Sequence, residues 1–267
     1  MKRDTTEMFY QLVALLLSVI FVHAVYVTVV RPNADSVIRR HAEQAAAGEP
    51  YVVPRTFFIV IKDVEQESCF ILMFWALAIM GYKARTAARE KKMFGMSLIN
   101  IAEGTRVLPD DAGQLARPLQ SLPETQQQYL LPRALQTALT RFQVTSSIES
   151  AIEAINTISE TENSRLDSEL SMIRYITWAI PSIGFIGTVR GIGAALSQAH
   201  RAVEGDITGV TQNLGIAFNS TFIALLLSIV MMFFIHQLQH RQERLIHDTG
   251  AYCQRYLINK LRAGRLP

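Results

Sequence analysis

The sequence contains few charged residues and few cysteines. Asp, Glu, Lys and Arg together make up 18% of its 267 residues, whereas they make up about 25% of a typical soluble domain. The net charge of +3 is too small to indicate a nucleic-acid-binding protein. Of the two cysteines, Cys69 lies in an apolar stretch and Cys253 in a basic tail. No disulfide framework is therefore indicated.

The polar part of the sequence also lacks residues arranged for catalysis. It contains neither a nucleophile paired with a base nor the spacing of metal ligands. Four histidines lie beside apolar segments or in the C-terminal tail, namely His200, His236, His240 and His247. We therefore expect no enzymatic activity, no cofactor and no metal site.

Long apolar segments take the place of these features, and 49% of the residues are hydrophobic. A membrane-spanning helix needs about 20 mainly apolar residues. Residues 8–30 and 214–235 reach this length without a charge, and residues 175–199 reach it with Arg190 as their one charge. Residues 69–82 are too short alone, so this helix must begin within the charged stretch 62–67, which we place at the membrane surface. The first segment is longer than the apolar part of a signal peptide, which favours a retained helix over a cleaved one.

The positions of lysine and arginine predict the orientation of these four helices. Basic residues follow the second helix at 83–92 and the fourth at 241–265, and two more precede the first helix. With four spans these three regions fall on one side, which places both termini in the cytoplasm. The opposite loops are residues 31–55 and 200–213, and the first of them contains four arginines. The lysines and arginines therefore favour this orientation, although they do not all lie on the predicted cytoplasmic side.

The region between the second and third spans is expected to form a helical cytoplasmic domain. Prolines interrupt its first half, whereas residues 134–180 contain neither Gly nor Pro. This absence predicts one helix, about 70 Å long, that runs from the cytoplasm into the membrane. Its apolar stripe must pack on neighbouring helices. Its acidic middle is either a solvated face or a surface that attracts a partner or cations.

Small and polar residues form a stripe on each of the last two spans. The third span carries Pro181, Gly184, Thr188, Gly191 and Ala195. The fourth carries Ala217, Thr221, Ala224 and Ser228. Such stripes allow close helix packing in lipid, and Gly187 and Gly191 form a GxxxG pair. The alternative is a pore-facing or partner-facing surface, on which the hydroxyls of Thr188 and Thr221 pass an ion or a water along. The spacing alone leaves both interpretations open.

No Asp or Glu lies deep in any of the four spans. A proton path through a membrane usually needs a titratable carboxylate or histidine. His23, toward the outer end of the first span, is typical of an interfacial histidine. If protons cross here, we expect the key carboxylate on another chain. Arg190 lies in the outer third of the membrane, where it either snorkels to the surface, pairs with an acid of a partner or repels cations at the outer mouth.

Two motifs in these spans resemble the MotA/TolQ/ExbB family of ion-channel subunits. Residues 180–191 read Ile-Pro-Ser-Ile-Gly-Phe-Ile-Gly-Thr-Val-Arg-Gly, similar to the family's Ala-Pro-x-x-Gly-x-x-Gly-Thr-Val-x-Gly. Residues 214–221 read Leu-Gly-Ile-Ala-Phe-Asn-Ser-Thr, similar to its Gly-Ile-x-x-Ala-Leu-x-x-Thr pattern in a shortened form. This chain departs from the family at Ile180, Phe218, Ala224 and Arg190. The resemblance is strong over residues 170–240.

The resemblance implies roles for these residues. Thr188 and Thr221 would line the ion path, Asn219 and Ser220 would add polarity suited to sodium as well as protons, and Pro181 would bend the third span. The close-packing positions would be Gly184, Gly187, Gly191, Ala217 and Ala224. Arg190 would be a charge at the outer mouth.

The resemblance also implies the assembly and its location. It predicts a homopentamer around two copies of a single-span MotB/TolR/ExbD-like partner, whose membrane helix bears an Asp. The lipid bilayer would be the bacterial inner membrane, and nucleic acid would not be a partner. Transported H⁺ or Na⁺ would drive rotation and mechanical work. The alternative function is a non-conducting oligomeric membrane scaffold. Four spans match the stator-type subunits, whereas TolQ and ExbB have three, so the first span is equally consistent with an accessory helix.

These inferences divide the chain into five parts. They are an N-terminal transmembrane helix with a periplasmic loop (1–56), a second transmembrane helix (57–82), a cytoplasmic helical domain (83–171), the two-helix channel core (172–240) and a cytoplasmic C-terminal helix (241–267).

Overall fold

The fold is all-helical in the computed structural model, which describes residues 2–46, 56–99, 101–102 and 105–262. Contacts divide the chain into two compact units. Unit 1 comprises Met1–Gly81 and Met172–Ile235, and unit 2 comprises Tyr82–Ser171 and His236–Pro267. A single parallel bridge between Val107 and Leu261 is the one β-type pairing among the described residues. The end of the predicted first loop, residues 47–55, lies outside the described residues.

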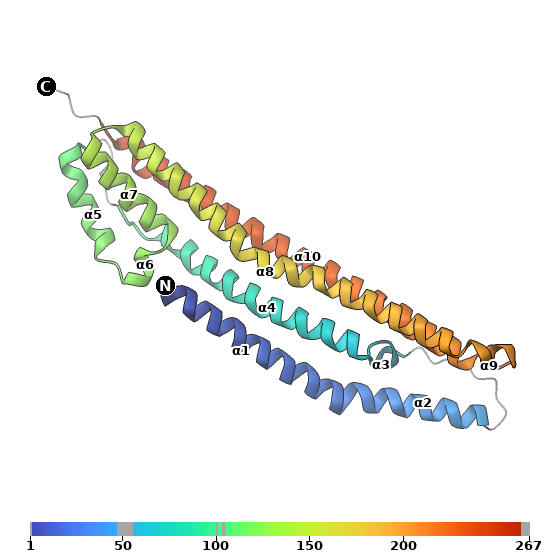
Figure 1. The fold of residues 1–267 in the computed structure, drawn as a ribbon. Coiled ribbons are helices and arrows are strands. Elements are labelled where there is room, and N and C mark those ends of the chain that lie inside the picture. Colours follow the sequence, from blue (N-terminus) through green and yellow to red (C-terminus); the bar gives the residue numbers. More distant parts are fainter. Residues whose placement is uncertain (1, 47–55, 100, 103–104, 263–267) are drawn as a thin grey trace. The chain divides into compact units, whose positions relative to one another are not determined.

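Four helical segments are long and apolar enough to cross a membrane, as the sequence predicts, and the chain is therefore a multi-pass membrane protein. The first comprises α1 (Lys2–Val25), a π-helical segment η1 (Tyr26–Val30) and α2 (Arg31–Ala46). The others are α4 (Val64–Lys91), α8 (Ile148–Ser197) and α10 (Thr208–Tyr256), which Figure 1 shows as long continuous ribbons. The shorter helices are α3 (Phe57–Val60), α5 (Ala112–Gln120), α6 (Glu124–Gln127), α7 (Leu130–Thr145) and α9 (Ala199–Val203).

The outer loop predicted from residue 31 onward is wrong in its first part, because residues 31–46 continue the helix as α2. Pro32 lies just after the π-helical segment η1 in an uninterrupted helix, and such a local π segment accommodates the missing N–H of a proline. The following residues up to Ala46 contain no further Gly or Pro and include four alanines, the residue with the highest helix propensity. Polar composition alone does not end a helix.

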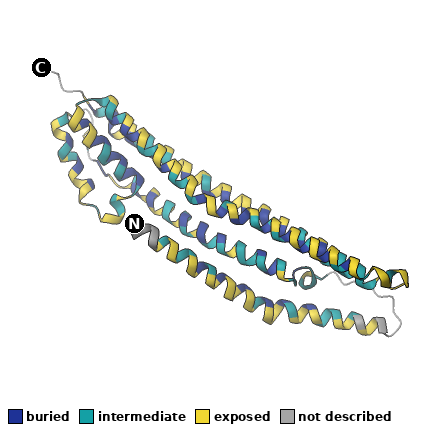
Figure 2. Ribbon diagram, viewed as in Figure 1, coloured by how far each residue is buried: buried dark blue, intermediate teal, exposed yellow. Residues whose placement is uncertain are grey.

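In unit 1, α1 packs along α4 through polar contacts as well as apolar ones. The Tyr10 hydroxyl donates a hydrogen bond to the Ala78 carbonyl at 3.2 Å. In return, Trp75 Nε1 donates to the Gln11 carbonyl at 2.9 Å. The opposite face of α1 is exposed over most of its length, as the yellow residues in Figure 2 show. An apolar exposed face is what a helix in contact with lipid requires.

Near the Val64 end of α4, one buried carboxylate joins α4 to the N-terminal helix. The side chain of Glu67 is 7% exposed. Its oxygens lie 2.7 Å from His23 Nδ1 and 2.5 Å from Arg31 Nη2. A buried carboxylate is stable only with such partners. The sequence predicts that the charges of residues 62–67 lie at the membrane surface, and within this stretch the structure encloses Glu67 in protein.

Unit 2 has its own hydrophobic core, built around α5 and α7. The apolar face expected on residues 135–142 lies at its centre, because Leu135, Leu139 and Phe142 are fully buried. Leu119 from α5 and Leu257, beyond the end of α10, complete the same cluster.

The single helix predicted over residues 134–180 is wrong, because the chain breaks between α7 and α8. Ser146 has a φ of +54°, in the left-handed region, and its N–H donates to the Phe142 carbonyl. The Ser147 hydroxyl then accepts a hydrogen bond from the Ser150 N–H at 3.2 Å, which is an N-cap for α8. Two adjacent serines thus end one helix and begin the next without Gly or Pro.

A chain of alternating charges joins α4, α7 and α8 within unit 2. Lys83 Nζ lies 2.8 Å from Glu169, and Glu169 lies 2.8 Å from Arg165. Arg165 also contacts Glu162, whose other partner is Arg133 at 2.9 Å. Lys83 and Glu162 are almost fully buried. Each therefore requires an oppositely charged neighbour to offset its loss of hydration. This explains part of the acidic middle of α8, which the sequence leaves open between a solvated face and a docking surface.

Candidate functional site

The small-residue stripes of α8 and α10 face each other in unit 1. A Cβ atom added at Gly187 would lie 2.6 Å from Ser220 Cβ, and one added at Gly191 would lie 2.8 Å from Ala217 Cβ. Gly184 meets Ala224 even more closely. Real Cβ atoms essentially never approach within 3.0 Å. The predicted positions are therefore sites of close helix packing.

Within this contact the two threonines come together. Thr188 Oγ1 and Thr221 Oγ1 are in hydrogen-bonding contact with each other. Thr188 Oγ1 also lies 3.0 Å from the Ala217 carbonyl, and both hydroxyls lie within 3.3 Å of the Gly184 carbonyl. Together the two hydroxyls can donate only two hydrogen bonds, whereas more than two acceptor oxygens lie within their reach. Each can therefore change its acceptor, and both side chains are only half-buried.

Pro181 changes the backbone hydrogen bonding of α8 about two turns before Thr188. Since proline has no N–H, the carbonyl four residues earlier, that of Thr177, loses its helical donor. The Ser228 hydroxyl of α10 lies 3.3 Å from that carbonyl and donates to it. Ser228 belongs to the predicted stripe, and its contact compensates for Pro181 while α8 continues through residue 181.

The other two predicted pathway residues lie apart from the threonine pair. Ser220 is 1% exposed, and its hydroxyl donates to the Ile216 carbonyl and accepts from Gln66 Nε2 of α4 at 3.5 Å. Asn219 precedes Thr221 by two positions, which is about 200° around a helix. The structure therefore brings Thr188 and Thr221 together, and it directs Ser220 toward α4.

Arg190 has a partner in its own chain. Its Nε lies 2.6 Å from Glu65 Oε1 and its Nη2 lies 2.7 Å from Glu65 Oε2, so the pair is bidentate. The side chain of Glu65 is 11% exposed and that of Arg190 is 55% exposed. A Cβ on Gly187 would lie 3.1 Å from Glu65 Cγ. The aliphatic part of Glu65 thus packs on the glycine one turn before Arg190.

Sequence reasoning did not assign Glu65 a role, because we treated residues 62–67 as surface charges. One signal was present, since a lone arginine in an apolar span needs an acid at the same membrane depth. Asp63, just before α4, belongs to the same group. Burial raises the pKa of the Asp63 carboxyl, Glu65 adds to this shift, and the charges of Lys62 and Arg190 oppose it.

Among the described residues, no group of three or more His, Cys, Asp or Glu side chains is placed to hold a metal ion.

Comparison with known proteins supports the assignment of the motifs. Neither the curated proteins nor the solved structures contain a match to the chain. A family model described as the MotA/TolQ/ExbB proton channel family matches residues 124–250, which include both motifs and the threonine pair. This match confirms the resemblance to the MotA/TolQ/ExbB proton channel family over residues 124–250.

Proposed function

We propose that this chain is the channel subunit of an ion-driven rotary motor, in which H⁺ or Na⁺ passes the Thr188–Thr221 pair. The carrying observation is the contact of these two half-buried hydroxyls on neighbouring helices of a proton channel family segment. Hydroxyls that can exchange acceptors can solvate a passing cation or relay a proton through water. Asn219 and Ser220 belong to this proposal as secondary contributors of polarity.

The titratable group is proposed to come from a partner. The apolar segments 8–30, 69–82, 175–199 and 214–235 contain no Asp or Glu, and Glu65 and Glu67, at the start of α4, are each paired with cations. The family works in oligomers with partners of the MotB/TolR/ExbD type. We therefore propose a homopentamer around two copies of a single-span partner with a membrane Asp. Its location would be the bacterial inner membrane, with both termini in the cytoplasm, and ion flow would turn the pentamer against the partner.

The alternative function is a non-conducting oligomeric scaffold. The observation that favours it is that Gly184, Gly187 and Gly191 pack against α10 of the same chain. Close packing alone explains these residues without any ion path. The hydroxyl pair is what the scaffold leaves unexplained, so the experiment should remove the hydroxyls and leave the packing.

Thr221→Val keeps the shape of the side chain and removes its hydroxyl. In liposomes that contain the chain together with its single-span partner, we expect this variant to assemble normally and to lose ion flux driven by a gradient. Thr161→Val is the matched control, because Thr161 is an exposed residue of α8 whose hydroxyl bonds only within its own helix. Full flux in an assembled Thr221→Val complex would contradict the proposed path and favour the scaffold.

A further inference from the structure

Four basic residues are exposed where α4 leaves the apolar part of the second span. They are Arg85, Arg89 and Lys91 of α4 and Lys92, which begins the short 3₁₀ helix η2 (Lys92–Gly95). All four belong to unit 2, and we call them the basic cluster. None of them forms an ion pair or a side-chain hydrogen bond with any residue that the structure describes. The function proposed above gives this cluster no role.

The other two charges on this stretch of α4 have partners inside the protein. Lys83 is 4% exposed and its Nζ lies 2.8 Å from Glu169. Glu90 is the single acid of residues 83–92. It is buried, and its carboxylate accepts a hydrogen bond from the Leu130 N–H at 3.2 Å. The basic cluster therefore has no countercharge on the exposed side of its own helix.

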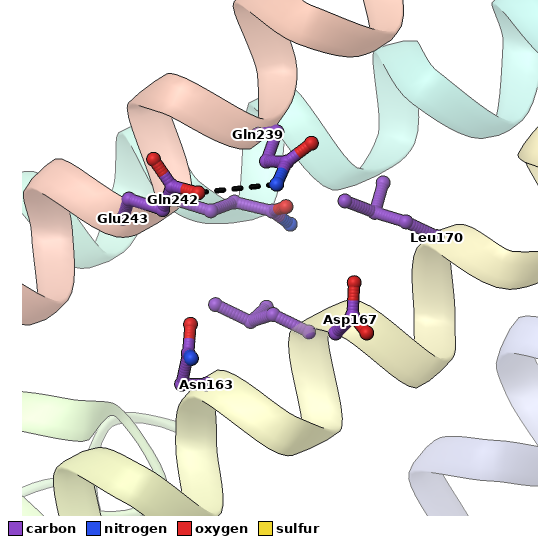
Figure 3. Close-up of a pocket in the computed structure, with 7 residues that line it drawn as sticks. Asn163, Asp167, Leu170, Gln239, Gln242 and Glu243 are labelled. Carbon is purple, nitrogen blue, oxygen red and sulfur yellow. Dashed lines mark hydrogen bonds between the residues drawn. The ribbon is translucent and has the colours of Figure 1, made fainter.

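Negative charge in unit 2 gathers on other helices. The acids Asp167 and Glu243 line a cavity of about 100 Å³ between α8 and α10, which Figure 3 shows. No residue of α4 is among the described residues that line this cavity. The acids of the cavity and the basic cluster thus lie on different helices.

The position of the cluster along α4 places it beside the lipid headgroups. The apolar run of this span ends at Tyr82. With a rise of about 1.5 Å per residue, Arg85 and Arg89 follow that end by about 5 and 10 Å. The headgroup layer on each side of the hydrocarbon core is about 5–8 Å deep. Helical side chains tilt toward the N-terminus of their helix, so these two long side chains lean back toward that layer.

The spacing of the two arginines suits a phosphate group. Arg85 and Arg89 lie one turn apart on the same face of α4, with about 5–6 Å between their Cβ atoms. Each guanidinium presents a planar fork of N–H donors that matches two phosphate oxygens. The exposed residue beside them on this face, Ala88, is small and leaves the approach open. Two forks at this spacing can hold one phosphodiester between them.

The charge of the cluster selects the class of lipid. Lys91 and Lys92 follow Arg89 within one turn, and their charges act over a Debye length of about 8 Å. A zwitterionic headgroup carries its own ammonium group, which these charges repel. An anionic headgroup offers the phosphate without that repulsion.

We propose that the basic cluster binds the headgroups of anionic phospholipids in the leaflet at the C-terminal end of α4. Arg85 and Arg89 hold the phosphodiester, and Lys91 and Lys92 add attraction. Clusters of about four to eight Lys and Arg beside a membrane-spanning helix are typical of sites for anionic lipids. The bound lipids would fix the depth of α4 in the membrane. The proposal requires that the chain spans a membrane, and it does not depend on whether the chain conducts ions.

The test counts lipids bound to the full chain in a neutral detergent by native mass spectrometry. Phosphatidylglycerol is the anionic probe, and phosphatidylcholine with the same acyl chains is the zwitterionic one. We expect the parent chain to bind phosphatidylglycerol more tightly. One basic residue near the surface changes such an affinity by about fivefold, so Arg85→Gln and Arg89→Gln should each weaken phosphatidylglycerol binding by about that factor. A variant with all four residues changed to Gln should bind both lipids equally.

Arg141→Gln is the matched control and should leave both affinities unchanged. Arg141 is an exposed arginine of α7 in the same unit. It borders a groove together with Ser150 and Glu153 of α8. Glu153 precedes the apolar segment 175–199 by about 33 Å of helix. Arg141 is therefore too far along the helices to reach a headgroup.

Thermal unfolding provides a second measurement. Because the lipid binds the folded chain, phosphatidylglycerol should raise the unfolding temperature of the parent more than phosphatidylcholine does. The difference should vanish in the fourfold variant, which should still fold because surface substitutions change stability little. Equal binding of both lipids by the parent, an unchanged preference in the fourfold variant, or an equal loss in Arg141→Gln would each overturn the proposal. An unchanged preference together with a loss of oligomers would assign the cluster to a protein interface instead.

Discussion

At the scale of single residues, contact distances decide what a glycine or an aspartate does here. Gly191 and Gly193 are neighbours on α8, yet one faces Ala217 and the other faces open space. Asp63 and Asp206 are both acids outside the long helices, yet the first is largely enclosed and the second is exposed. In neither pair does the residue type alone predict the contacts or the exposure of the residue, because its surroundings in the fold determine them.

Gly191→Ala should destabilise the chain because its new methyl group would lie 2.8 Å from Ala217 Cβ and from the Ala217 backbone nitrogen. Overpacking of this kind costs about 1–3 kcal/mol. Gly193→Ala is the matched control, since nothing lies within 4 Å of its added Cβ and alanine favours the helix by about 1 kcal/mol. Thermal unfolding in detergent should thus shift in opposite directions. A loss of stability in both variants would contradict the packing seen at Gly191.

Asp63→Asn should stabilise the chain at neutral pH. Because the folded-state pKa of Asp63 is raised, the folded chain retains this proton more strongly than the unfolded chain, and stability falls as pH rises through that interval. An amide does not ionise, so the gain over the parent should be small at about pH 4 and should grow toward pH 7.

Asp206→Asn is the opposite case and serves as the control. The Thr208 N–H donates to Asp206 Oδ1 at 3.0 Å, which lowers the pKa of this carboxyl. Its stabilising effect is therefore present at neutral pH and lost as pH falls through the lowered pKa. Unfolding temperatures of both variants and the parent, recorded across pH, check the two signs. Parallel curves for Asp63→Asn and the parent would contradict the effect of burial.

At the scale of elements, the break between α7 and α8 depends on two side chains. Ser146 adopts the left-handed conformation, which costs a non-glycine residue about 1–2 kcal/mol, and Ser147 caps α8. Ser146→Gly should raise the stability of the chain by up to about 1 kcal/mol, whereas Ser147→Ala should lower it by about 1 kcal/mol. Chemical unfolding checks both. If Ser146→Gly is destabilising, the chain does not turn at this residue in the manner described.

The elements also show what sequence patterns can and cannot predict. The four long apolar helices follow from hydropathy, and the small-residue stripes that carry Thr188 and Thr221 follow from spacings of three and four residues. The break at Ser146 could not be predicted from Gly or Pro, because serine can adopt the same backbone when a cap follows. The pairing of Arg190 with Glu65 joins positions far apart in the sequence, and periodicity within one helix carries no information about such a contact.

At the scale of the whole molecule, ion pairs connect helices that are distant in the sequence. Glu65 and Arg190 connect α4 to α8, and Glu67 connects α4 to the N-terminal helix. The N-terminal helix is thus attached to the second span along its length rather than only at a loop. An accessory helix added to a three-span core would need such an attachment.

The Glu65–Arg190 pair can be tested by reversing its charges. Glu65→Arg and Arg190→Glu alone should each lower the unfolding temperature, because each places two like charges together. The double variant restores opposite charges and should recover most of the loss. Since Arg190 is half-exposed, we expect a coupling energy of about 1 kcal/mol in the double-mutant cycle. Additive losses in the double variant would show that the two side chains do not interact.

The bond from Trp75 Nε1 to the Gln11 carbonyl has an optical consequence. The chain contains two tryptophans, and Trp178 is 76% exposed on α8. Trp178→Phe would leave Trp75 as the sole indole, with its polar edge held by the backbone of the N-terminal helix. The emission of that indole would then report directly whether α1 remains docked on α4, in detergent or in a native membrane, without any added label.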